Sequence, residues 1–249
     1  MEAAIAACRI IMDALDKPRV ANLKGKTNLV TETDHLSEKT IKSIIRGSFP
    51  DHSFLAEESG QDLSKSDYLW IIDPLDGTTN FVHGYPSFAV SIALYYKNEP
   101  QVAVIIEMPN TKLYSAIKGE GVWCEGQPVS CSESDSLEKS LLVTGFGYEH
   151  GELWEENMRL YKHFTDTTQG VRRLGAAAVD LCHVASGKVD GFWEFDLQPW
   201  DTAAGILIAQ EAGCLVTQMN GLDYSIYDNN ILVTNPKIHI EMVKNIEDV

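Results

Sequence analysis

The residues best suited to chemistry lie in the phrase WIIDPLDGTTNF, residues 70–81. An apolar run leads straight into Asp73, a proline fixes the backbone, and Asp76 follows just before Gly77 and Thr78. The pattern D-P-x-D-G is also ordinary turn chemistry. Taken alone, the phrase therefore predicts a turn as readily as a site.

Other carboxylates stand at comparable places. Glu57 and Glu58 follow the apolar run HSFLA, and Asp34 stands in NLVTETD, where a strand-like run gives way to a helix. Asp201 precedes an almost uniformly apolar helical segment that closes at Gly213, so we predict that Asp201 is the N-cap of a buried helix. Because structural carboxylates prefer water, this placement favours a shared site.

Carboxylates gathered in one pocket need a cation. At about 4 Å and an effective dielectric of about 20, each like-charged pair costs on the order of 4 kcal/mol. No matching set of Arg or Lys and no His or Cys cluster accompanies these motifs. Oxygen ligands alone favour Mg²⁺, with Mn²⁺ as a possible substitute. Mg²⁺ with open positions for water and phosphate suits phosphoryl transfer, and the N–H groups of Gly77 and Thr78 could bind the phosphate.

Helices and strands must position these residues. Apolar spacing predicts helices over 2–15 and 36–49, and short branched and aromatic runs between 68 and 117 predict a meander of antiparallel strands. Beyond residue 140, strands alternate with helices, one of them over 175–187. We therefore predict an α+β half over 1–140 and an α/β half over 141–249.

The composition limits the class of protein. The 249 residues are 44% hydrophobic and carry 20 basic against 36 acidic residues, a net charge of −16, so we expect no nucleic-acid and no membrane partner. The five cysteines are scattered and read as reduced, packed thiols. The N-terminus resembles no secretory signal, so we expect a cytoplasmic protein, or a plastid one if a transit peptide was removed.

Two phrases together carry a family resemblance. DPLDGTTNF, followed far downstream by WDTAAGILIAQEAG, resembles the paired signature of the inositol monophosphatase family. With NLVTETD and HSFLAEESG upstream, the resemblance spans nearly the whole chain. It implies a layered αβαβα sandwich, an α+β and α/β fold with metal ions between its halves.

The resemblance also implies metal ligands. Glu57, Asp73 and the backbone carbonyl of Leu75 would bind the first Mg²⁺. Asp73, Asp76 and Asp201 would hold the second, with Asp73 bridging the two ions. Glu57 would reach a third, weaker ion through water, which gives two to three ions in all.

Catalytic and substrate-binding residues follow in the same way. Thr78, supported by Asp34, resembles the pair that orients and deprotonates the attacking water, and we count Glu57 with them as catalytic. Glu194 matches the family's contact to a substrate ring hydroxyl, although it could be a strand-end surface residue. The predicted substrate-binding residues are Asp76, Gly77, Thr78, Gly175, Ala176, Ala177, Glu194 and Asp201.

Some positions stay open at this point. Only one of the adjacent Glu57 and Glu58 is expected to point inward, and His83 is expected to be a solvated loop residue. The loop 23–28 is short where relatives help to hold the third ion. In RRLGAAAVD, Arg172 or Arg173 could serve a subunit contact instead of the pocket.

The substrate is the main alternative left open. We expect hydrolysis of inositol 1-phosphate, with Li⁺ sensitivity and a homodimer implied by the resemblance. Fructose 1,6-bisphosphate and histidinol phosphate remain alternatives, whereas 3'-phosphoadenosine 5'-phosphate is disfavoured because the chain is short. A non-catalytic regulatory protein is a further alternative, since a fold does not fix a function.

Overall fold

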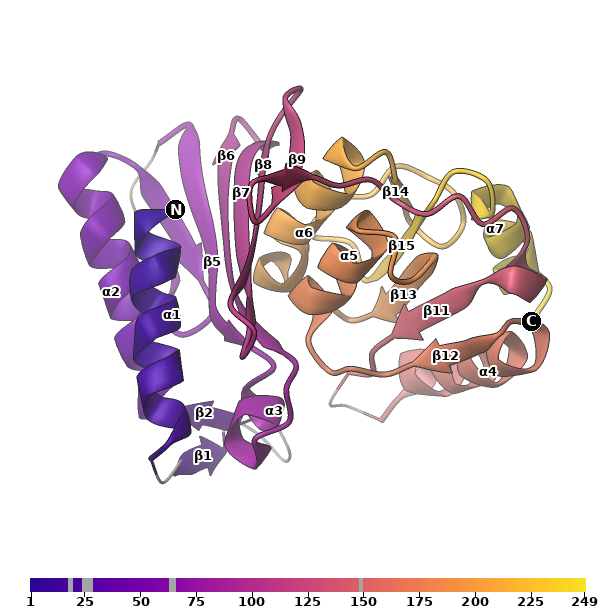
Figure 1. Ribbon diagram of the computed structural model, residues 1–249, viewed down its shortest axis with the longest axis horizontal. Coiled ribbons are helices and arrows are strands. Elements are labelled where there is room, and N and C mark those ends of the chain that lie inside the picture. The colour runs from indigo at the N-terminus through magenta and orange to yellow at the C-terminus, as the bar shows by residue number, and fades with distance from the viewer. Residues whose placement is uncertain (18–19, 24–28, 63–65, 148–149) are drawn as a thin grey trace.

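The structure is a computed structural model that describes residues 1–17, 20–23, 29–62, 66–147 and 150–249. Its elements stack in five layers: two helices, an eight-stranded sheet, two helices, a five-stranded sheet and two outer helices (Figure 1). This arrangement confirms the αβαβα sandwich predicted from the sequence.

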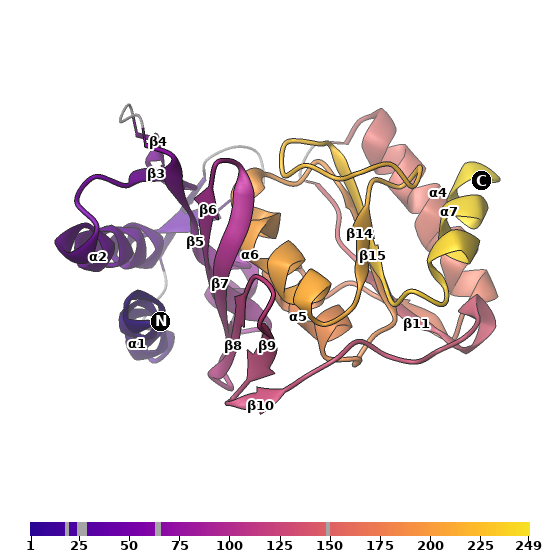
Figure 2. The same cartoon turned by 90° about the horizontal axis from the view of Figure 1, so that it is seen from above.

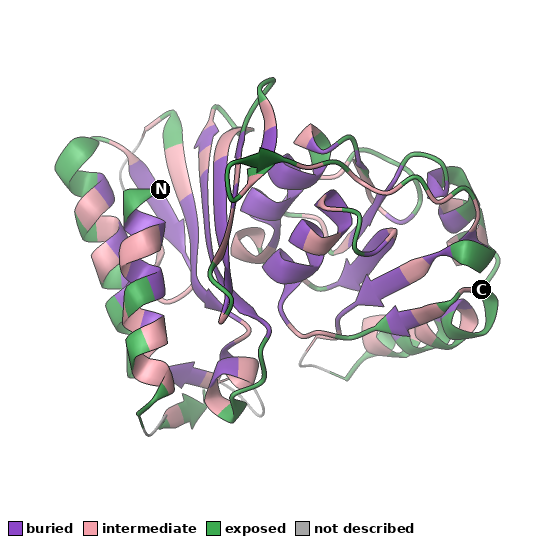
Figure 3. Cartoon of the chain, viewed as in Figure 1, coloured by how far each residue is buried: buried purple, intermediate pink, exposed green. Residues whose placement is uncertain are grey.

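Two amphipathic helices form the first layer. α1 (Glu2–Leu15) coincides with the predicted helix, and it buries Ala4, Ala7 and Ile11 against α2 (Glu32–Ser48) and the eight-stranded sheet. The outward faces of both helices are exposed (Figure 3).

The prediction for the second helix is wrong at both ends. α2 begins before the predicted range because Thr31 caps it and its acidic first turn carries no apolar stripe. Leu36, the first residue of the predicted range, is 51% exposed, and Phe49, its last residue, lies beyond the end of the helix. Ile41 and Ile45 form the face that contacts the core.

The eight-stranded sheet has the order β10-β9-β8-β7-β6-β5-β3-β4, and every neighbouring pair is antiparallel except β3 with β5. The predicted meander is therefore confirmed. The strands are β3 (Ser53–Ala56), β4 (Gly60–Gln61), β5 (Tyr68–Asp76), β6 (Phe88–Tyr96), β7 (Glu99–Met108), β8 (Lys112–Ile117), β9 (Gly121–Cys124) and β10 (Gln127–Pro128).

The central strands of this sheet read as continuous apolar runs because helices cover both of its faces. Figure 2 shows α1 and α2 on one face and α5 and α6 on the other. One buried cluster fills each interface, and residues of β6 and β7 contribute to both clusters in alternation. The eight-stranded sheet thus separates two hydrophobic cores.

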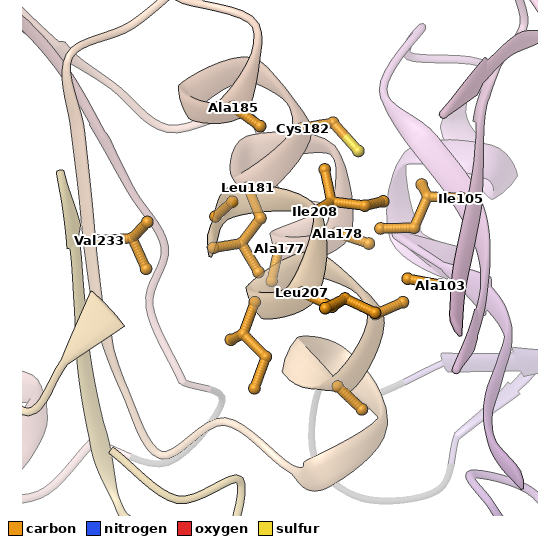
Figure 4. Close-up of a cluster of buried hydrophobic side chains, with 14 of the residues drawn as sticks. Ala103, Ile105, Ala177, Ala178, Leu181, Cys182, Ala185, Leu207, Ile208 and Val233 are labelled. Atoms are coloured by element: carbon orange, nitrogen blue, oxygen red, sulfur yellow. The ribbon is translucent and has the colours of Figure 1, made fainter. Parts of the chain in front are cut away.

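Two apolar helices, α5 (Ala177–Ala185) and α6 (Pro199–Glu211), form the middle layer. Figure 4 shows Ile208 facing Ile105 of the eight-stranded sheet, with Val233 of the second sheet on the opposite side. Gly205 allows α5 and α6 to approach closely, since a Cβ at this position would lie 2.3 Å from Leu181 Cδ1. The buried character predicted for α6 is confirmed.

The second sheet has the order β12-β11-β13-β15-β14. β11 runs parallel to β12 and β13, and β15 runs antiparallel to β13 and β14. Two outer helices that the sequence reading did not single out complete the fifth layer. These elements are β11 (Leu141–Thr144), α4 (Glu152–Thr167), β12 (Gly170–Arg172), β13 (Gly191–Phe195), β14 (Leu215–Thr217), β15 (Asn230–Thr234) and α7 (His239–Glu247).

Short elements complete the chain: β1 (Ala21–Leu23), β2 (Leu29–Thr31), α3 (Thr78–His83) and the 3₁₀ turn η1 (Leu137–Lys139). Across the described ranges, no helix is both long and apolar enough to cross a membrane.

The division near residue 140 stays a prediction. The first sheet ends at Pro128 and the second begins at Leu141, which fits two structural halves. The large middle cluster, however, draws buried side chains from both sheets, including Ile105 and Val233. The two halves therefore share one core.

Candidate active site

A β-bulge in β5 brings two carboxylates to one face of the sheet. Asp73 pairs with Ser91 and Asp76 pairs with Ala89, so three steps on β5 match two steps on β6. Residues three apart normally point to opposite faces, but the extra residue restores the same face. Leu75 packs into the core on the α1–α2 side, and both aspartates face α5 and α6.

The turn after β5 requires a glycine. Gly77 has φ 82°, and a Cβ there would lie 2.9 Å from the carbonyl oxygen of Ser87 and 3.1 Å from the Cβ of Ala176. Gly77 is the N-cap of the short helix α3, which starts at Thr78. The close approach packs the start of the predicted 175–177 stretch directly on this turn.

Thr78 and Asp34 form the hydrogen-bonded pair that the resemblance predicts. The Thr78 hydroxyl lies 2.9 Å from Asp34 Oδ1 and 3.0 Å from the carbonyl oxygen of Leu75. Its single proton can be donated to either acceptor, and its lone pairs stay available to a third group. The Leu75 carbonyl is thereby oriented toward the site.

Local sequence fixes Asp34. It is the third residue of α2, and its Oδ2 accepts hydrogen bonds from the Thr31 N–H at 2.9 Å and the Thr31 hydroxyl at 2.5 Å. Thr31 in turn accepts from the N–H of Thr33, which completes a capping box. The phrase TETD therefore holds a fully buried carboxylate toward Thr78.

Asp201 occupies a matching position, which corrects the predicted cap. The N-cap of α6 is Gln198, because Pro199 suits the first helical position, and Asp201 is the third residue of the helix. Its Oδ2 accepts the N–H of Gln198 at 2.7 Å. As predicted, the helix stops before Gly213, which has φ 89°.

Asp76 connects the end of β5 to the start of α5. Its Oδ2 accepts the N–H of Ala178, in the first turn of α5, at 2.7 Å. This bond directs the positive end of a helix at the carboxylate. Across the same region, the Asn80 amide donates to the carbonyls of Ser87 at 2.6 Å and Leu174 at 2.7 Å. Sequence reasoning did not single out Asn80.

Burial and mutual repulsion raise the pKa values of the carboxyl groups in this region. For Asp73, burial raises the pKa well above its usual range, and Glu57, Asp76 and Asp201 raise it further, against the N–H of Leu75. Burial raises the pKa of Asp76 to about 7, with the N–H of Ala178 acting against it. Burial, and then Asp76, raise the pKa of Asp201. The site therefore holds more negative charge than its own groups neutralise.

These residues fit a magnesium site by donor type. Glu57, Asp73, Asp76, Asp201 and the Leu75 carbonyl offer only oxygen, which hard divalent cations prefer. Their mutual effect on pKa shows that the four carboxylates lie within electrostatic reach of one another. In the described parts of the chain, no three acidic, His or Cys side chains already form a closed ligand shell. A cation would have to draw them together.

Glu194 lies in the same buried region, not on the surface. It is 7% exposed on β13, and burial, then Asp201 and Asp76, raise its pKa against the opposing charge of Arg173. Its carboxylate covers Gly145, because a Cβ at that position would lie 2.2 Å from Glu194 Oε1. Gly145 is thus a residue that sequence reasoning missed.

A hydrogen-bond network supports the strand ends beside Glu194. Asn157 donates to the carbonyl of Gly145 at 2.6 Å and accepts from the indole of Trp193 at 2.6 Å. Thr144 donates to the carbonyl of Trp193 at 2.6 Å. These bonds hold β11 and β13 in register where Glu194 and Gly145 meet.

Asp180 is a second acidic residue that sequence reasoning missed. It is 1% exposed in α5, and neither of its carboxylate oxygens has a hydrogen-bond partner. Burial, and then Glu194 and Asp76, raise its pKa, while Arg173 lowers it. A lone aspartate inside AAAVDLCHVA was the available signal.

Arg172 and Arg173 have different surroundings. Both are exposed, but Arg173 lines a cleft of about 330 Å³ and acts on the buried carboxyls of Asp180 and Glu194, whereas Arg172, on β12, does neither. The cleft adjoins the turn that carries Thr78, and its size suits a small ligand. It is lined by Thr79, Asn80, Phe146, Gly147, His150, Trp154, Arg173 and Gly175.

The structure describes two of the other positions that the sequence left open, Glu58 and His83, and only the start of the loop 23–28. The Glu58 side chain is 4% exposed and lies 3.8 Å from His35 Nδ1, so it is as buried as a site residue although it sits beside α2. His83 is the exposed last residue of α3 instead of a loop residue. In the loop 23–28, residues 24–28 lie outside the described residues.

Comparison with known proteins gives consistent matches. The model of the inositol monophosphatase family matches residues 1–249. Phosphatase IMPL1, chloroplastic, of Arabidopsis thaliana is 49% identical over 251 residues, covering 98% of this chain and 68% of that protein. The Nus factor SuhB of Pseudomonas aeruginosa is 37% identical over 254 residues, covering 99% and 94%.

A solved structure of the same family has the same fold. The structure of inositol monophosphatase from Anabaena (Nostoc) sp. PCC 7120 superposes with a TM-score of 0.88 at 41% identity, covering 100% of this chain and 93% of that one. The similarity therefore extends over both sheets and all five layers.

Proposed function

Because the chain belongs to the inositol monophosphatase family, we propose that it hydrolyses a small phosphate monoester with Mg²⁺, and that inositol 1-phosphate is its preferred substrate. One observation carries this proposal. The carboxylates of Asp73, Asp76 and Asp201 repel one another, and the turn directly after Asp76 carries Thr78, whose hydroxyl is hydrogen-bonded to Asp34. Family membership supports the coarser function, that of a phosphatase.

The proposed metal ligands are those that the family resemblance implies, and their all-oxygen donor set supports them. Glu57, Asp73 and the Leu75 carbonyl would hold one ion, and Asp73, Asp76 and Asp201 a second, with Mn²⁺ as a substitute. When bound, the ions neutralise the carboxylates, polarise the phosphate and make water a stronger nucleophile. A third ion near Glu57 remains part of the proposal.

Thr78 and Asp34 handle the proton. The Thr78 hydroxyl donates to Asp34 and can accept a hydrogen bond from the attacking water, so it orients one lone pair of that water toward phosphorus. As the new P–O bond forms, the water proton passes toward Asp34 through Thr78. The ester P–O bond breaks, and the alcohol leaves after taking up one proton.

The remaining residues position the substrate. The N–H groups of Gly77 and Thr78, with Ala176 packed on the turn, define the phosphate end. Glu194 would accept a hydrogen bond from a ring hydroxyl. The cleft beside Gly175 leaves room for the rest of a small polyol or sugar.

The deciding experiment is phosphate release from a panel of substrates: inositol 1-phosphate, fructose 1,6-bisphosphate, histidinol phosphate and 3'-phosphoadenosine 5'-phosphate. Each is measured with Mg²⁺, with EDTA, and with Mg²⁺ plus Li⁺. The matched control is Asp76→Asn, which removes one site charge at nearly constant volume and should abolish release.

The outcomes separate the claims. Release that needs Mg²⁺ and is highest with inositol 1-phosphate supports mechanism and substrate together. Faster release from another member keeps the mechanism and replaces the substrate. Full activity in EDTA, or in Asp76→Asn, contradicts the metal assignment.

A second candidate is a regulatory role beside or instead of catalysis. The observation that favours it is the 37% identity to a protein named Nus factor SuhB. If no substrate on the panel is hydrolysed under any condition, this candidate replaces the first.

The oligomeric state and compartment belong to the proposal as well. We propose a homodimer without nucleic-acid or membrane partners, in the cytoplasm or in a plastid. Light scattering on an eluting chromatographic peak would give twice the 27.6 kDa chain mass for the dimer.

A further inference from the structure

A strap of residues 129–140 crosses from the first sheet to the second. It leaves β10, passes the ends of the middle helices and reaches β11 through η1 (Figure 2). The N–H of Cys131 donates to the carbonyl of Ala212 at 3.0 Å, and the Ser132 hydroxyl donates to Asp190 at 2.6 Å. The strap is therefore tied beside the C-terminal end of α6.

This tie brings two thiols together. Cys131 lies on the strap and is half-buried, and Cys214 is 6% exposed just beyond α6. A Cβ on Gly213, the residue before Cys214, would lie 3.8 Å from Cys131 Sγ, and each thiol changes the pKa of the other. Both are unoxidised in the structure.

The pKa values of the two thiols are shifted in opposite directions. The hydrogen bond from Cys214 lowers the pKa of Cys131 to about 7, although burial acts in the opposite direction. The same bond, with burial, raises the pKa of Cys214. By contrast, burial raises the pKa of Cys8 and Cys182. The lowered pKa of Cys131 favours its thiolate, the form that attacks disulfides.

We propose that Cys131 and Cys214 form a reversible intramolecular disulfide by exchange with a low-molecular-weight disulfide such as oxidised glutathione. The Cys131 thiolate attacks one sulfur of the reagent, whose S–S bond breaks and releases one thiolate. Cys214 then loses its proton to solvent and attacks the Cys131 sulfur, which releases the second thiolate. Two protein thiols and one reagent disulfide become one protein disulfide and two reagent thiols.

The bond would tie the strap covalently to α6. It would close a loop from residue 131 to residue 214, which contains α4, α5, α6 and most of the second sheet. A cross-link over so long a loop restricts the unfolded chain more than the folded one. Asp201 sits at the opposite end of α6, so we expect stability to change and the site to keep its geometry.

The test equilibrates the full chain with reduced and oxidised glutathione at several ratios. Thiol titration should fall from five to three groups, and mass spectrometry of a non-reducing digest should show the peptides of residues 131 and 214 joined. The Tm of the oxidised protein should rise by about 5 °C. Reduction by dithiothreitol should reverse both changes.

Matched variants make the proposal falsifiable. Cys131→Ser and Cys214→Ser should each abolish the Tm shift and the cross-link, whereas Cys8→Ser should keep both. A stable glutathione adduct on Cys131, or a disulfide involving Cys124 or Cys182, would overturn the pairing. None of these readouts depends on phosphatase activity.

Discussion

Asp34 and Asp201 occupy equivalent places in two different helices. Each is the third residue of its helix, each accepts the N–H of its N-cap residue, and each belongs to a capping box. Their chain neighbours are unrelated, TETD in one case and QPWD in the other. The same local device thus fixes one carboxylate in a helix on each side of the eight-stranded sheet.

Their surroundings differ in charge. Asp34 receives hydrogen bonds from Thr31 and from the Thr78 hydroxyl, all neutral donors. Asp201 faces Asp76 and Glu57, which with burial raise its pKa. The protein supplies hydrogen-bond donors to both oxygens of the first carboxylate, whereas the second is surrounded by like charges. A capping box alone therefore does not determine a carboxylate's role.

The largest expected effect comes from Asp201→Asn. Removing a proposed ligand charge should lower turnover by about 1000-fold. In EDTA the same variant should have a higher Tm than the wild type, because repulsion with Asp76 is lost. Steady-state kinetics and thermal melts check both effects, and a lower Tm in EDTA would contradict the repulsion argument.

Asp34→Asn should lower the stability of the protein, whereas Asp201→Asn should raise it in EDTA. Turnover should fall by about 100-fold. An amide that points its NH₂ at Thr31 or Thr78 loses an acceptor, so we expect a loss of about 1–2 kcal/mol in the free energy of unfolding. Denaturant melts should show this loss both with Mg²⁺ and with EDTA. Stabilisation in EDTA would place Asp34 in the same class as Asp201.

The pH dependence of stability tests the same contrast without mutation. Asp76 has a folded pKa of about 7, above the unfolded value of about 3.9, so the native state retains this proton more tightly. The contribution of Asp76 to the stability of the metal-free protein should therefore be greatest below the unfolded value. It should fall between about pH 5 and 7, by about 1.4 kcal/mol per pH unit for one such group.

Saturating Mg²⁺ should remove that decline because it keeps the carboxylates ionised. Melts of the wild type and of Asp76→Asn at several pH values provide the measurement. A metal-free wild type whose stability is constant from pH 5 to 7 would contradict the raised pKa.

The smallest effect is expected at Gly145. In Gly145→Ala, the new Cβ would displace the Glu194 carboxylate and raise the KM for inositol 1-phosphate by about 10-fold. Hydrolysis of a simple aryl phosphate should change little. Glu194→Gln is the matched variant and should shift KM in the same direction. An equal loss on both substrates would indicate a structural defect instead.

Much of the fold could be predicted because apolar periodicity is local. The helix over 2–15 and the strand meander follow directly from side-chain spacing. The errors arose at helix starts, where a capping residue decides the boundary: Thr31 begins α2 early, and Gln198 replaces Asp201 as the cap of α6.

The site was predictable where residues repeat a known phrase, and less so where tertiary packing decides. Thr78 and Asp34 meet although they are far apart in sequence, as the resemblance implied. Gly145 carries no local signal, because its importance depends on Glu194 reaching it from another strand, whereas the local signal for Asp180 is a lone aspartate in an apolar helix. The metal ligands themselves stay predictions.

The bulge in β5 makes the site sensitive to chain length more than to side-chain identity. Since the extra residue is what aligns Asp73 with Asp76, another apolar side chain at Leu75 would leave both carboxylates on the inner face. Deleting that single residue would turn one carboxylate toward α1 and α2, into an apolar core. In evolutionary terms, this segment can vary by substitution but hardly by insertion or deletion.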